Sequence, residues 1–260
     1  MTQQQRVALV TGGGSGIGRA AAIRLAQDGM RVAVVGRSAD ELQQVVNEIA
    51  ATGGEAHSFL ADVGDAATVD AATQQVLDRW GRIDALLANA GINGVWAPLE
   101  QLKHEEWEET LRINLTGTFL TVKAAVPALK KQGGAIVIVS SVNGTRMFSN
   151  TGASAYATSK AGQVAFAKMI AVELAPARVR VNVICPGAID TAIDDNTEKR
   201  NLADVKIPVE YPAGQIPLTG KQSGTAEQVA DLVAFLLSDG ASHITGTEVW
   251  IDGAQSLLMG

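Results

Sequence analysis

Seven short apolar runs, most of them rich in valine or isoleucine at consecutive positions, limit how this chain can fold. Branched residues that follow one another, rather than alternate with polar ones, are typical of strands buried on both faces of a parallel sheet. Helical patterns separate the runs, as in 40–54, an amphipathic stretch that ends in two glycines. This alternation predicts a doubly wound α/β sheet with right-handed crossovers. The predicted strands are 6–10, 31–35, 55–61, 83–88, 135–140, 178–184 and 247–251.

The composition fits one globular domain. The chain has 260 residues, of which 47% are apolar and 18% charged. This suits a large buried core and not a disordered chain. No linker, repeat or low-complexity tract interrupts the pattern, so we predict a single domain over 1–260. The one cysteine, Cys185, excludes an intrachain disulfide, and its position at a strand end favours a buried small residue over a nucleophile.

Charge and hydropathy exclude several classes of partner. A net charge of -6 provides no basic field for nucleic acid or an anionic membrane. No apolar stretch reaches the roughly 18 residues of a membrane span, and the N-terminal apolar run is too short for a signal peptide. The three histidines are scattered without ligand spacing, so no metal site is expected. We expect a cytoplasmic protein.

The segment 188–224 breaks the alternation of strands and helices. It carries three prolines and several charges, with no long periodic run. A loop of this length inside a compact domain is usually functional. It follows the predicted strand 178–184, so it should lie over the carboxyl edge of the sheet, where open α/β sheets bind ligands. We therefore expect 188–224 to form the substrate-binding region.

A glycine cluster joins the first predicted strand to the first helix. Gly12, Gly16 and Gly18 would let the backbone turn tightly and approach a ligand closely. The helix begins near Ser15 to Ile17, and its free N–H groups could face a pyrophosphate. The Gly-x3-Gly-x-Gly spacing departs from the Gly-x-Gly-x-x-Gly fingerprint, and a simple tight turn is the alternative. The strand–loop–helix context favours nucleotide binding.

The end of the second predicted strand bears on the choice of nucleotide. An acidic residue there usually holds the ribose 2′-hydroxyl of NAD, whereas an arginine can accommodate the 2′-phosphate of NADP. This strand runs into Gly36 and Arg37, and the first acids, Asp40 and Glu41, read as the first turn of a helix. Arg37 could bond a phosphate with its planar fork, or be a solvated strand-end residue.

Polar residues and glycine follow three further predicted strands. In a parallel sheet these ends meet at one crevice. Asparagine is a poor residue for a helix interior, so Asn114 within a helical pattern suggests a local role. In "SAYATSK", Tyr156 and Lys160 lie four positions apart on one helical face, where the alternative is a surface helix with a snorkelling lysine. The strand-end residues are Asp62 and Val63, Asn89 to Gly91, and Ser140 and Ser141.

In this order, these motifs resemble the short-chain dehydrogenase/reductase family, in its compact branch, over essentially the whole chain. The resemblance implies a single-domain doubly wound Rossmann fold, with a seven-stranded parallel sheet and helices on both faces. It also implies hydride transfer between NAD(P) and an alcohol or ketone. The motifs are Thr11-Gly12, Gly16-Ile17-Gly18, Asp62-Val63, Asn89-Ala90-Gly91, Asn114, Ser141, Tyr156-x3-Lys160, Pro186-Gly187 with Thr191, and "IDGA".

The chemistry explains the tyrosine and the lysine. A tyrosine hydroxyl titrates near 10 when unperturbed, and a neighbouring ammonium favours the phenolate, which would bring Tyr156 nearer the working pH as general acid and base. The resemblance implies that Lys160 also holds the nicotinamide ribose, that Ser141 bonds the substrate oxygen, and that Asn114 helps to hold a water. It implies further cofactor contacts at Gly12, Ser15, Gly16, Ile17, Gly18, Asp62, Val63, Asn89, Ala90, Gly91, Pro186, Gly187 and Thr191.

Two departures from the family pattern need a choice. Counting back thirteen residues from Tyr156, where many members have the catalytic serine, reaches Asn143. The strand-end Ser-Ser pattern instead selects Ser141 and requires two extra residues in the loop that follows. We prefer Ser141, because a surface loop tolerates insertion more easily than an active site tolerates loss of its hydroxyl. The other departure is Ala254, where a second glycine is common.

Several functional hypotheses remain open on the sequence. We favour NADP(H) as cofactor, with NAD(H) as the alternative. A 3-oxoacyl carrier-protein reductase is less favoured, because "INGVWAPLE" lacks the arginine usual in those enzymes and the chain is acidic. A catalytically silent dinucleotide-binding regulator is the third hypothesis. The apolar helices 105–131 and 153–175 predict a homotetramer or homodimer, and the sequence does not identify the small-molecule substrate.

Overall fold

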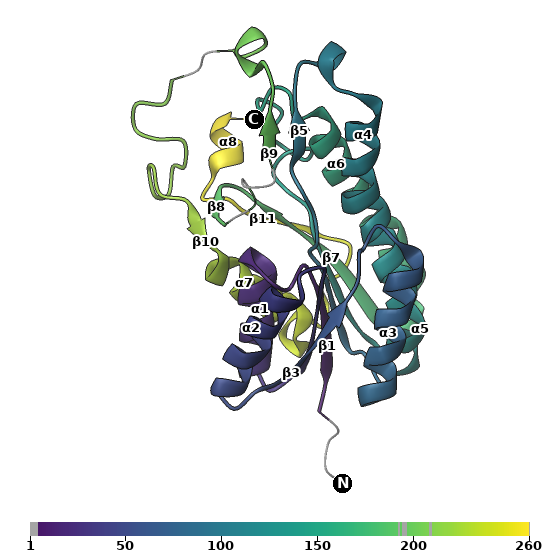
Figure 1. The fold of residues 1–260 in the computed structure, drawn as a ribbon. Coiled ribbons are helices and arrows are strands. Elements are labelled where there is room, and N and C mark those ends of the chain that lie inside the picture. The colour runs from purple at the N-terminus through teal and green to yellow at the C-terminus, as the bar shows by residue number, and fades with distance from the viewer. Residues whose placement is uncertain (1–4, 192, 194–196, 208–209, 260) are drawn as a thin grey trace.

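A parallel sheet of seven strands forms the centre of the molecule (Figure 1), in the order β11-β7-β6-β4-β1-β2-β3. The computed structural model describes residues 5–191, 193, 197–207 and 210–259. All seven predicted strands are confirmed, with ends that shift by at most two residues. The strands are β1 (Val7–Thr11), β2 (Arg31–Gly36), β3 (Glu55–Leu60), β4 (Ala85–Ala88), β6 (Gly134–Val139), β7 (Val179–Pro186) and β11 (Glu248–Ile251).

Helices cover both faces of the sheet, which explains why the strands are apolar at consecutive positions. In β1, Val7 and Leu9 join the core under α3, α5 and α6, whereas Ala8 and Val10 join the core under α1, α2 and α7. None of the helices in the described residues has the length and hydropathy of a membrane span. The α-helices are α1 (Gly16–Gln27), α2 (Ala39–Ala51), α3 (Ala66–Trp80), α4 (His104–Leu111), α5 (Gly117–Gln132), α6 (Ser154–Leu174), α7 (Ala226–Leu237) and α8 (Gln255–Met259), and the short 3-10 helices are η1 (Leu99–Gln101), η3 (Ala175–Ala177), η5 (Leu202–Asp204) and η6 (Asp239–Ala241).

The helix predicted over 105–131 is divided in two. A π-helical turn, η2 (Arg112–Thr116), separates α4 from α5. Asn114 lies at its centre and is fully buried, and its side chain bonds the backbone of Ile92 instead of facing solvent. Single π-helical turns inside α-helices often occur at functional sites.

The predicted substrate region 188–224 is tied to the rest of the molecule by two short parallel strand pairs. β9 (Thr197–Lys199) pairs with β5 (Gly94–Trp96), which follows the carboxyl end of β4. β8 (Ile189–Asp190) pairs with β10 (Gly224–Thr225), just before α7. Strands of two or three residues leave no periodicity, which is why the sequence predicted none here. The pairing with β5 holds this region at the carboxyl edge of the main sheet, as expected.

Candidate active site

The glycine loop between β1 and α1 has the geometry of a phosphate cradle. Gly12 and Gly16 have φ values of +63° and +50°, a conformation that favours glycine. A Cβ atom at Gly12 would lie only 2.8 Å from Asn89 Nδ2. Ser15 caps α1 in an extended conformation, and its hydroxyl makes no capping hydrogen bond. The N–H groups of the first turn of α1 therefore remain available to an anionic group such as a pyrophosphate.

The end of β4 is bonded directly to this loop. Asn89 Nδ2 donates to the carbonyl oxygens of Thr11 and Gly12, at 3.0 and 3.2 Å. The Thr11 hydroxyl accepts from the backbone N–H groups of Asn89 and Ala90, at 3.1 and 3.3 Å. The two predicted cofactor motifs thus form one hydrogen-bonded unit.

The residues after β7 approach the same loop from the other side. A Cβ atom at Gly16 would lie 3.3 Å from the Cβ of Thr191. Pro186 ends β7, and the N–H of Gly187 donates to Ile251 O at 3.1 Å. Gly18 packs so closely on the Gly12 carbonyl that any Cβ there would overlap it, and the preceding residue, Ile17, packs against the core. The structure therefore places Thr191 beside the glycine loop.

Arg37 is an exposed residue directly after β2. It makes no hydrogen bond or ion pair with the residues that the structure describes, so its guanidinium is available to a ligand. Burial raises the pKa of Asp62, but hydrogen bonds from Gly64 N and Arg112, with the charges of Arg112 and Arg37, outweigh this and hold it below its ordinary value. Asp62 is therefore a fixed carboxylate, and the adjacent Val63 is buried.

Glu41 is a residue near the cofactor loop that the sequence analysis assigned only to a helix start. A Cβ atom at Gly14 would lie 3.1 Å from Glu41 Oε2, so a carboxylate stands beside the glycine loop. The signal that could have found it is its place three residues after Ser38, whose hydroxyl caps α2 by accepting from Glu41 N at 3.5 Å. That cap brings the first turn of α2 toward the loop.

Tyr156 and Lys160 are both buried near the start of α6. Lys160 Nζ lies 5.5 Å from the centroid of the Tyr156 ring and donates to Val139 O, at the end of β6, at 2.9 Å. Burial lowers the pKa of Lys160 to about 8. The hydroxyl of Ser140 donates to Lys160 O at 2.8 Å, which ties α6 to the loop that carries Ser141.

Ser141 is nearly buried in the loop that follows β6, and its hydroxyl accepts from the backbone N–H of Asn143 at 3.1 Å. Its own proton therefore remains available to a substrate oxygen. The Asn143 side chain accepts from Asn150 at 3.1 Å. Thr145, which the sequence analysis did not single out, donates to Ser141 O at 2.8 Å and accepts from Trp250 at 3.2 Å.

Asn114 joins the loop after β4 to α6, the helix that carries Tyr156 and Lys160. Its Oδ1 accepts from Ile92 N at 2.8 Å, and its Nδ2 donates to Ile92 O at 2.9 Å and to Ser159 Oγ at 3.0 Å. A Cβ atom at Gly91 would lie 3.1 Å from Asn114 Oδ1 and 3.6 Å from Lys160 Nζ. Asn114, Gly91 and Lys160 therefore meet at one point.

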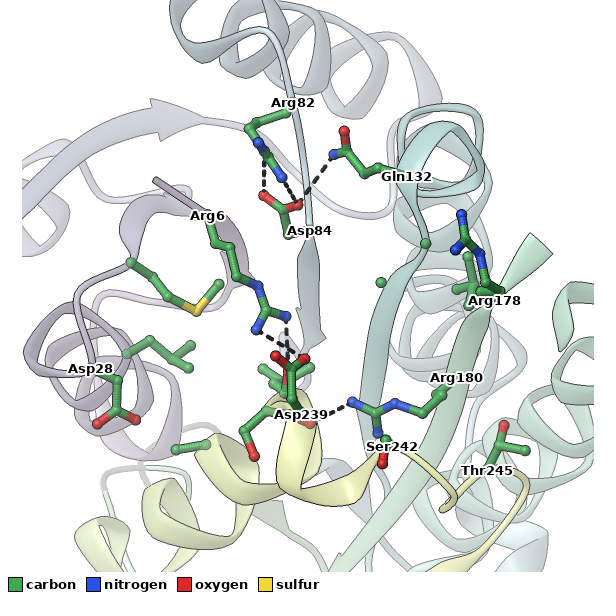
Figure 2. A pocket seen from close by; sticks show the side chains of 18 of the residues that line it. Arg6, Asp28, Arg82, Asp84, Gln132, Arg178, Arg180, Asp239, Ser242 and Thr245 are labelled. Carbon is green, nitrogen blue, oxygen red and sulfur yellow. Dashed lines mark hydrogen bonds and ion pairs between the residues drawn. The ribbon is translucent and has the colours of Figure 1, made fainter. Parts of the chain in front are cut away.

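A separate cavity of about 1120 Å³ opens at the amino edge of the sheet, away from these residues (Figure 2). Two of its arginines bond backbone carbonyl oxygens at the end of α7. Arg180 donates to the carbonyl oxygens of Leu236 and Ser238, at 2.7 and 2.8 Å, and Arg6 donates to Leu237 O at 3.1 Å. Cations at these positions satisfy the carbonyls at the end of α7.

Two other predictions concern reactive side chains. Cys185 is a buried free cysteine, which confirms its predicted burial. Burial raises the pKa of its thiol to about 12, and a thiol that stays protonated is a poor nucleophile. Within the described part of the chain, no group of three or more histidine, cysteine, aspartate or glutamate side chains could hold a metal ion.

Comparison with known proteins shows the family to which this chain is similar. A family model described as short chain dehydrogenase matches residues 6–202. Levodione reductase from Leifsonia aquatica is 39% identical over 255 residues, which cover 96% of this chain and 94% of that protein. The crystal structure of a 3-ketoacyl-ACP reductase from Sinorhizobium meliloti 1021 is 52% identical, with a TM-score of 0.94 over 97% of this chain and 99% of that one.

The structure of a third relative was solved with a bound nucleotide. It is the crystal structure of a 3-ketoacyl-(acyl-carrier-protein) reductase from Brucella melitensis complexed with NADH, which is 31% identical with a TM-score of 0.85, over 98% of this chain and all (100%) of that one. Together with the cradle and the buried tyrosine–lysine pair, these matches identify the chain. It belongs to the short-chain dehydrogenase/reductase family and is an NAD(P)-dependent oxidoreductase that acts on CH–OH or keto groups.

Proposed function

We propose that this chain transfers a hydride between NADP(H) and a secondary alcohol or ketone, with Tyr156 as general acid and base. The observation that carries the proposal is the buried ammonium of Lys160 beside the Tyr156 ring, held by the Val139 carbonyl and by no carboxylate of the described residues. An ammonium that is not neutralised by an acid favours the phenolate form of a neighbouring tyrosine.

Each residue then has one task. The nicotinamide, when bound, supplies or accepts the hydride. Tyr156 donates a proton to the substrate oxygen during reduction and removes it during oxidation. Ser141 donates its free hydroxyl proton to the same oxygen and stabilises the charge that develops there. Asn114 bonds the backbone of Ile92 and so fixes the loop that begins at Gly91. This loop would line the cofactor, and Asn114 holds the loop beside Lys160.

The glycine cradle and the start of α1, where the Ser15 side chain makes no capping bond, support a dinucleotide. Arg37, which makes no hydrogen bond or ion pair with the described residues, supports a 2′-phosphate on that dinucleotide. Ser38 adds to this, because its oxygen accepts from Glu41 N and its proton remains free to donate. Asp62, Val63 and Asn89 to Gly91 would line the adenosine and ribose. NAD(H) is the alternative, supported by Glu41 beside the glycine loop and by the relative crystallised with NADH.

We assign the whole chain, 1–260, to one cofactor-binding and catalytic domain, with 188–224 as the substrate-binding region. The tether between β5 and β9 and the exposed apolar residues Ile193 and Ile207 support a partly hydrophobic substrate. Val209, another apolar residue of this region, lies outside the described residues.

A second candidate substrate is a 3-oxoacyl thioester on a carrier protein, favoured by the 52% identity to the ketoacyl-ACP reductase. An acidic carrier protein needs basic residues around the mouth of the site. Arg200, beside β9, is paired with Glu106 at 2.5 Å and with Glu198 at 3.1 Å. This pairing makes Arg200 less available to an acidic carrier, and we keep the small ketone or alcohol as the first candidate.

We also propose a cytoplasmic homotetramer, with a homodimer as the alternative. Phe119, Met169 and Val172 are 44%, 75% and 79% exposed on α5 and α6. A second group, Phe235 and Leu257, is 47% and 72% exposed on α7 and α8. Two separate apolar faces suit two different interfaces. Light scattering that reported only monomer at micromolar concentration would exclude both assemblies.

The proposed function is tested by a panel of ketones, secondary alcohols and a short 3-oxoacyl thioester, each assayed with both cofactors. We expect turnover of at least one ketone–alcohol pair, faster with NADP(H) than with NAD(H). Turnover confined to the thioester would favour the carrier-protein function. Binding of a cofactor without turnover of any substrate would favour the silent regulator.

A further inference from the structure

Gln163 is a buried polar residue that the mechanism does not yet use. It lies on α6, three residues after Lys160, and is 1% exposed. Its Nε2 donates to Asn114 O and to Thr118 Oγ1, both at 2.8 Å. Thr118 Oγ1 in turn donates to Asn114 O at 2.7 Å. Because a carbonyl oxygen cannot donate, the amide nitrogen must be the atom that faces Asn114, which fixes the orientation of the amide.

The other end of the same amide is unsatisfied. Gln163 Oε1 is buried and has no hydrogen-bond partner among the described residues. Buried side-chain oxygens nearly always have a partner, and an ordered internal water supplies it where the protein does not. A valine or leucine would fill this position on the face of α6 without that cost, so the amide needs a local reason.

The reason is the link from Gln163 to the reacting groups. Asn114 belongs to the π-helical turn η2, and its Nδ2 donates to Ser159 Oγ at 3.0 Å. Ser159 Oγ donates to Tyr156 O at 2.7 Å. Three consecutive hydrogen bonds therefore join Gln163 to the backbone of the tyrosine, and the same Asn114 side chain bonds the backbone of Ile92, in the loop after β4.

We propose that Gln163 is a positioning residue of the active site: its amide nitrogen holds the π-helical turn that presents Asn114, and its amide oxygen seats a buried water. The effect on turnover rests on the proposed function, because it acts through Tyr156. The proposed water does not rest on that function, because the water depends only on the buried acceptor oxygen of Gln163.

Three substitutions separate this role from simple packing. Gln163→Met keeps the length of the side chain but removes both donor and acceptor. Thr118→Val removes the hydroxyl that bonds both Gln163 and Asn114 O. Thr121→Val is the matched control, because its buried hydroxyl donates to Gly117 O at 2.8 Å, one turn away from the Asn114 network.

We expect Gln163→Met and Thr118→Val to lower kcat by at least about tenfold, part of the 10²- to 10⁴-fold that general acid–base catalysis contributes. KM should stay close to the wild-type value, and the solvent deuterium isotope effect on kcat should rise, because proton transfer is what a displaced Tyr156 would slow. Thr121→Val should match wild type in all three measurements. Wild-type kcat in Gln163→Met, or an equal loss in Thr121→Val, would overturn the positioning role.

A high-resolution crystal structure of the wild-type protein provides the second readout, which requires no turnover. We expect an ordered water within hydrogen-bond distance of Gln163 Oε1, absent from the Gln163→Met crystal. A dry Oε1 in the wild-type crystal would overturn the proposed water. If no substrate is ever turned over, the proposed function fails, and the crystal still decides this part of the inference.

Discussion

Lys160 Nζ lies 5.5 Å from the centre of the Tyr156 ring while it donates to the backbone carbonyl of Val139. A carboxylate in place of that carbonyl would neutralise the ammonium and remove its influence on the tyrosine. The carbonyl fixes the position of the ammonium and leaves its charge intact. Burial favours loss of that charge, and lowers the pKa of Lys160 to about 8. The site therefore holds the positive charge of Lys160 at the cost of its burial, next to Tyr156, the group that must release a proton.

Tyr156→Phe should lose nearly all turnover, because only the proton donor is removed while the ring remains packed. General acid–base catalysis contributes about 10²-fold or more, so less than about a hundredth of the wild-type kcat should remain. Cofactor affinity, measured by fluorescence titration, should change little. Retention of more than about a tenth of the activity would contradict the role of Tyr156.

Ser141→Ala should cost far more activity than Asn143→Ala, and the pair forms a matched comparison. Asn143 contacts the Ser141 hydroxyl through its backbone N–H, which alanine keeps. Loss of a donor to a developing oxyanion typically costs about 10²- to 10³-fold in kcat. Steady-state kinetics of the two variants measures the difference. The reverse order would show that position 143, and not Ser141, corresponds to the catalytic serine of the family.

The pKa of Lys160 predicts how stability depends on pH. Below about pH 8 the lysine is charged in both folded and unfolded chains, and the fold bears the cost of a buried charge. Between about 8 and 10.5 the unfolded chain binds more protons than the folded one, so the free energy of unfolding rises with pH. Lys160→Met should therefore be more stable than wild type at pH 7, by on the order of 3 kcal/mol, and this advantage should shrink toward pH 10.

Chemical denaturation of the cofactor-free protein at several pH values measures this difference. Lys131→Met, at an exposed lysine, is the control, and its difference from wild type should not change over the same range. An advantage of Lys160→Met that stayed constant with pH would show that Lys160 is not buried in its charged form.

Much of the fold could be predicted from the sequence, because each buried strand leaves a run of branched apolar residues. All seven runs lie in the main sheet, including 247–251, which is at its edge. The π-helical turn around Asn114 could not be predicted, because the Asn114 side chain at its centre is bonded to Ile92, 22 residues earlier in the chain. The β5–β9 pair was also missed, because strands of three residues carry too little pattern.

The site residues divide in the same way. Glycines and strand-end residues of the candidate site could be named from the sequence because a motif of fixed spacing marks them. Thr145, Ser159 and Gln163 belong to no such motif, and their roles follow from partners far apart in the chain. One signal was available for Gln163: a polar residue on the helical face of Tyr156 and Lys160, where an apolar one would be expected in a buried helix.

Cofactor preference should depend on Arg37, Gly36 and Glu41. A charge-assisted bond from Arg37 to a 2′-phosphate contributes about 1.5–3 kcal/mol, or roughly ten- to a hundredfold in affinity. Arg37→Ala should therefore reduce the preference for NADP(H). Gly36→Asp should reverse it, because the new carboxylate would bond the 2′-hydroxyl of NAD and repel a phosphate. Glu41→Gln should increase it, because a carboxylate near the loop is removed.

The ratio of kcat/KM with NADP(H) to kcat/KM with NAD(H) is to be measured for the wild type and for these three variants. Asp65→Asn is a control, because that carboxylate caps α3 and does not contact the glycine loop. A wild-type preference for NAD(H), or a ratio that Arg37→Ala leaves unchanged, would show that Arg37 is only a solvated strand-end residue.

Ala254 has a φ of +69°, a left-handed conformation that costs a residue with a Cβ about 1–2 kcal/mol. Glycine is common at this position of the family, so the strain follows from the departure noted in the sequence. Ala254→Gly should raise the free energy of unfolding by up to about 1 kcal/mol, since greater freedom of the unfolded chain offsets part of the gain. Ala213→Gly, at a position whose own φ is not positive, should not stabilise the protein.

The attachment of 188–224 through β5 and β9 has a consequence for protein engineering. Parallel pairing joins backbone to backbone, so it does not depend on which side chains β9 carries, provided that proline is avoided. Tyr156 and Lys160 lie on α6, outside this region. Residues between β9 and β10 can therefore be randomised as a library to alter which ketone is accepted, while the proton-transfer residues stay in place. Under the proposed function, the segment that selects the substrate is then separate in the chain from the helix that carries the proton-transfer residues.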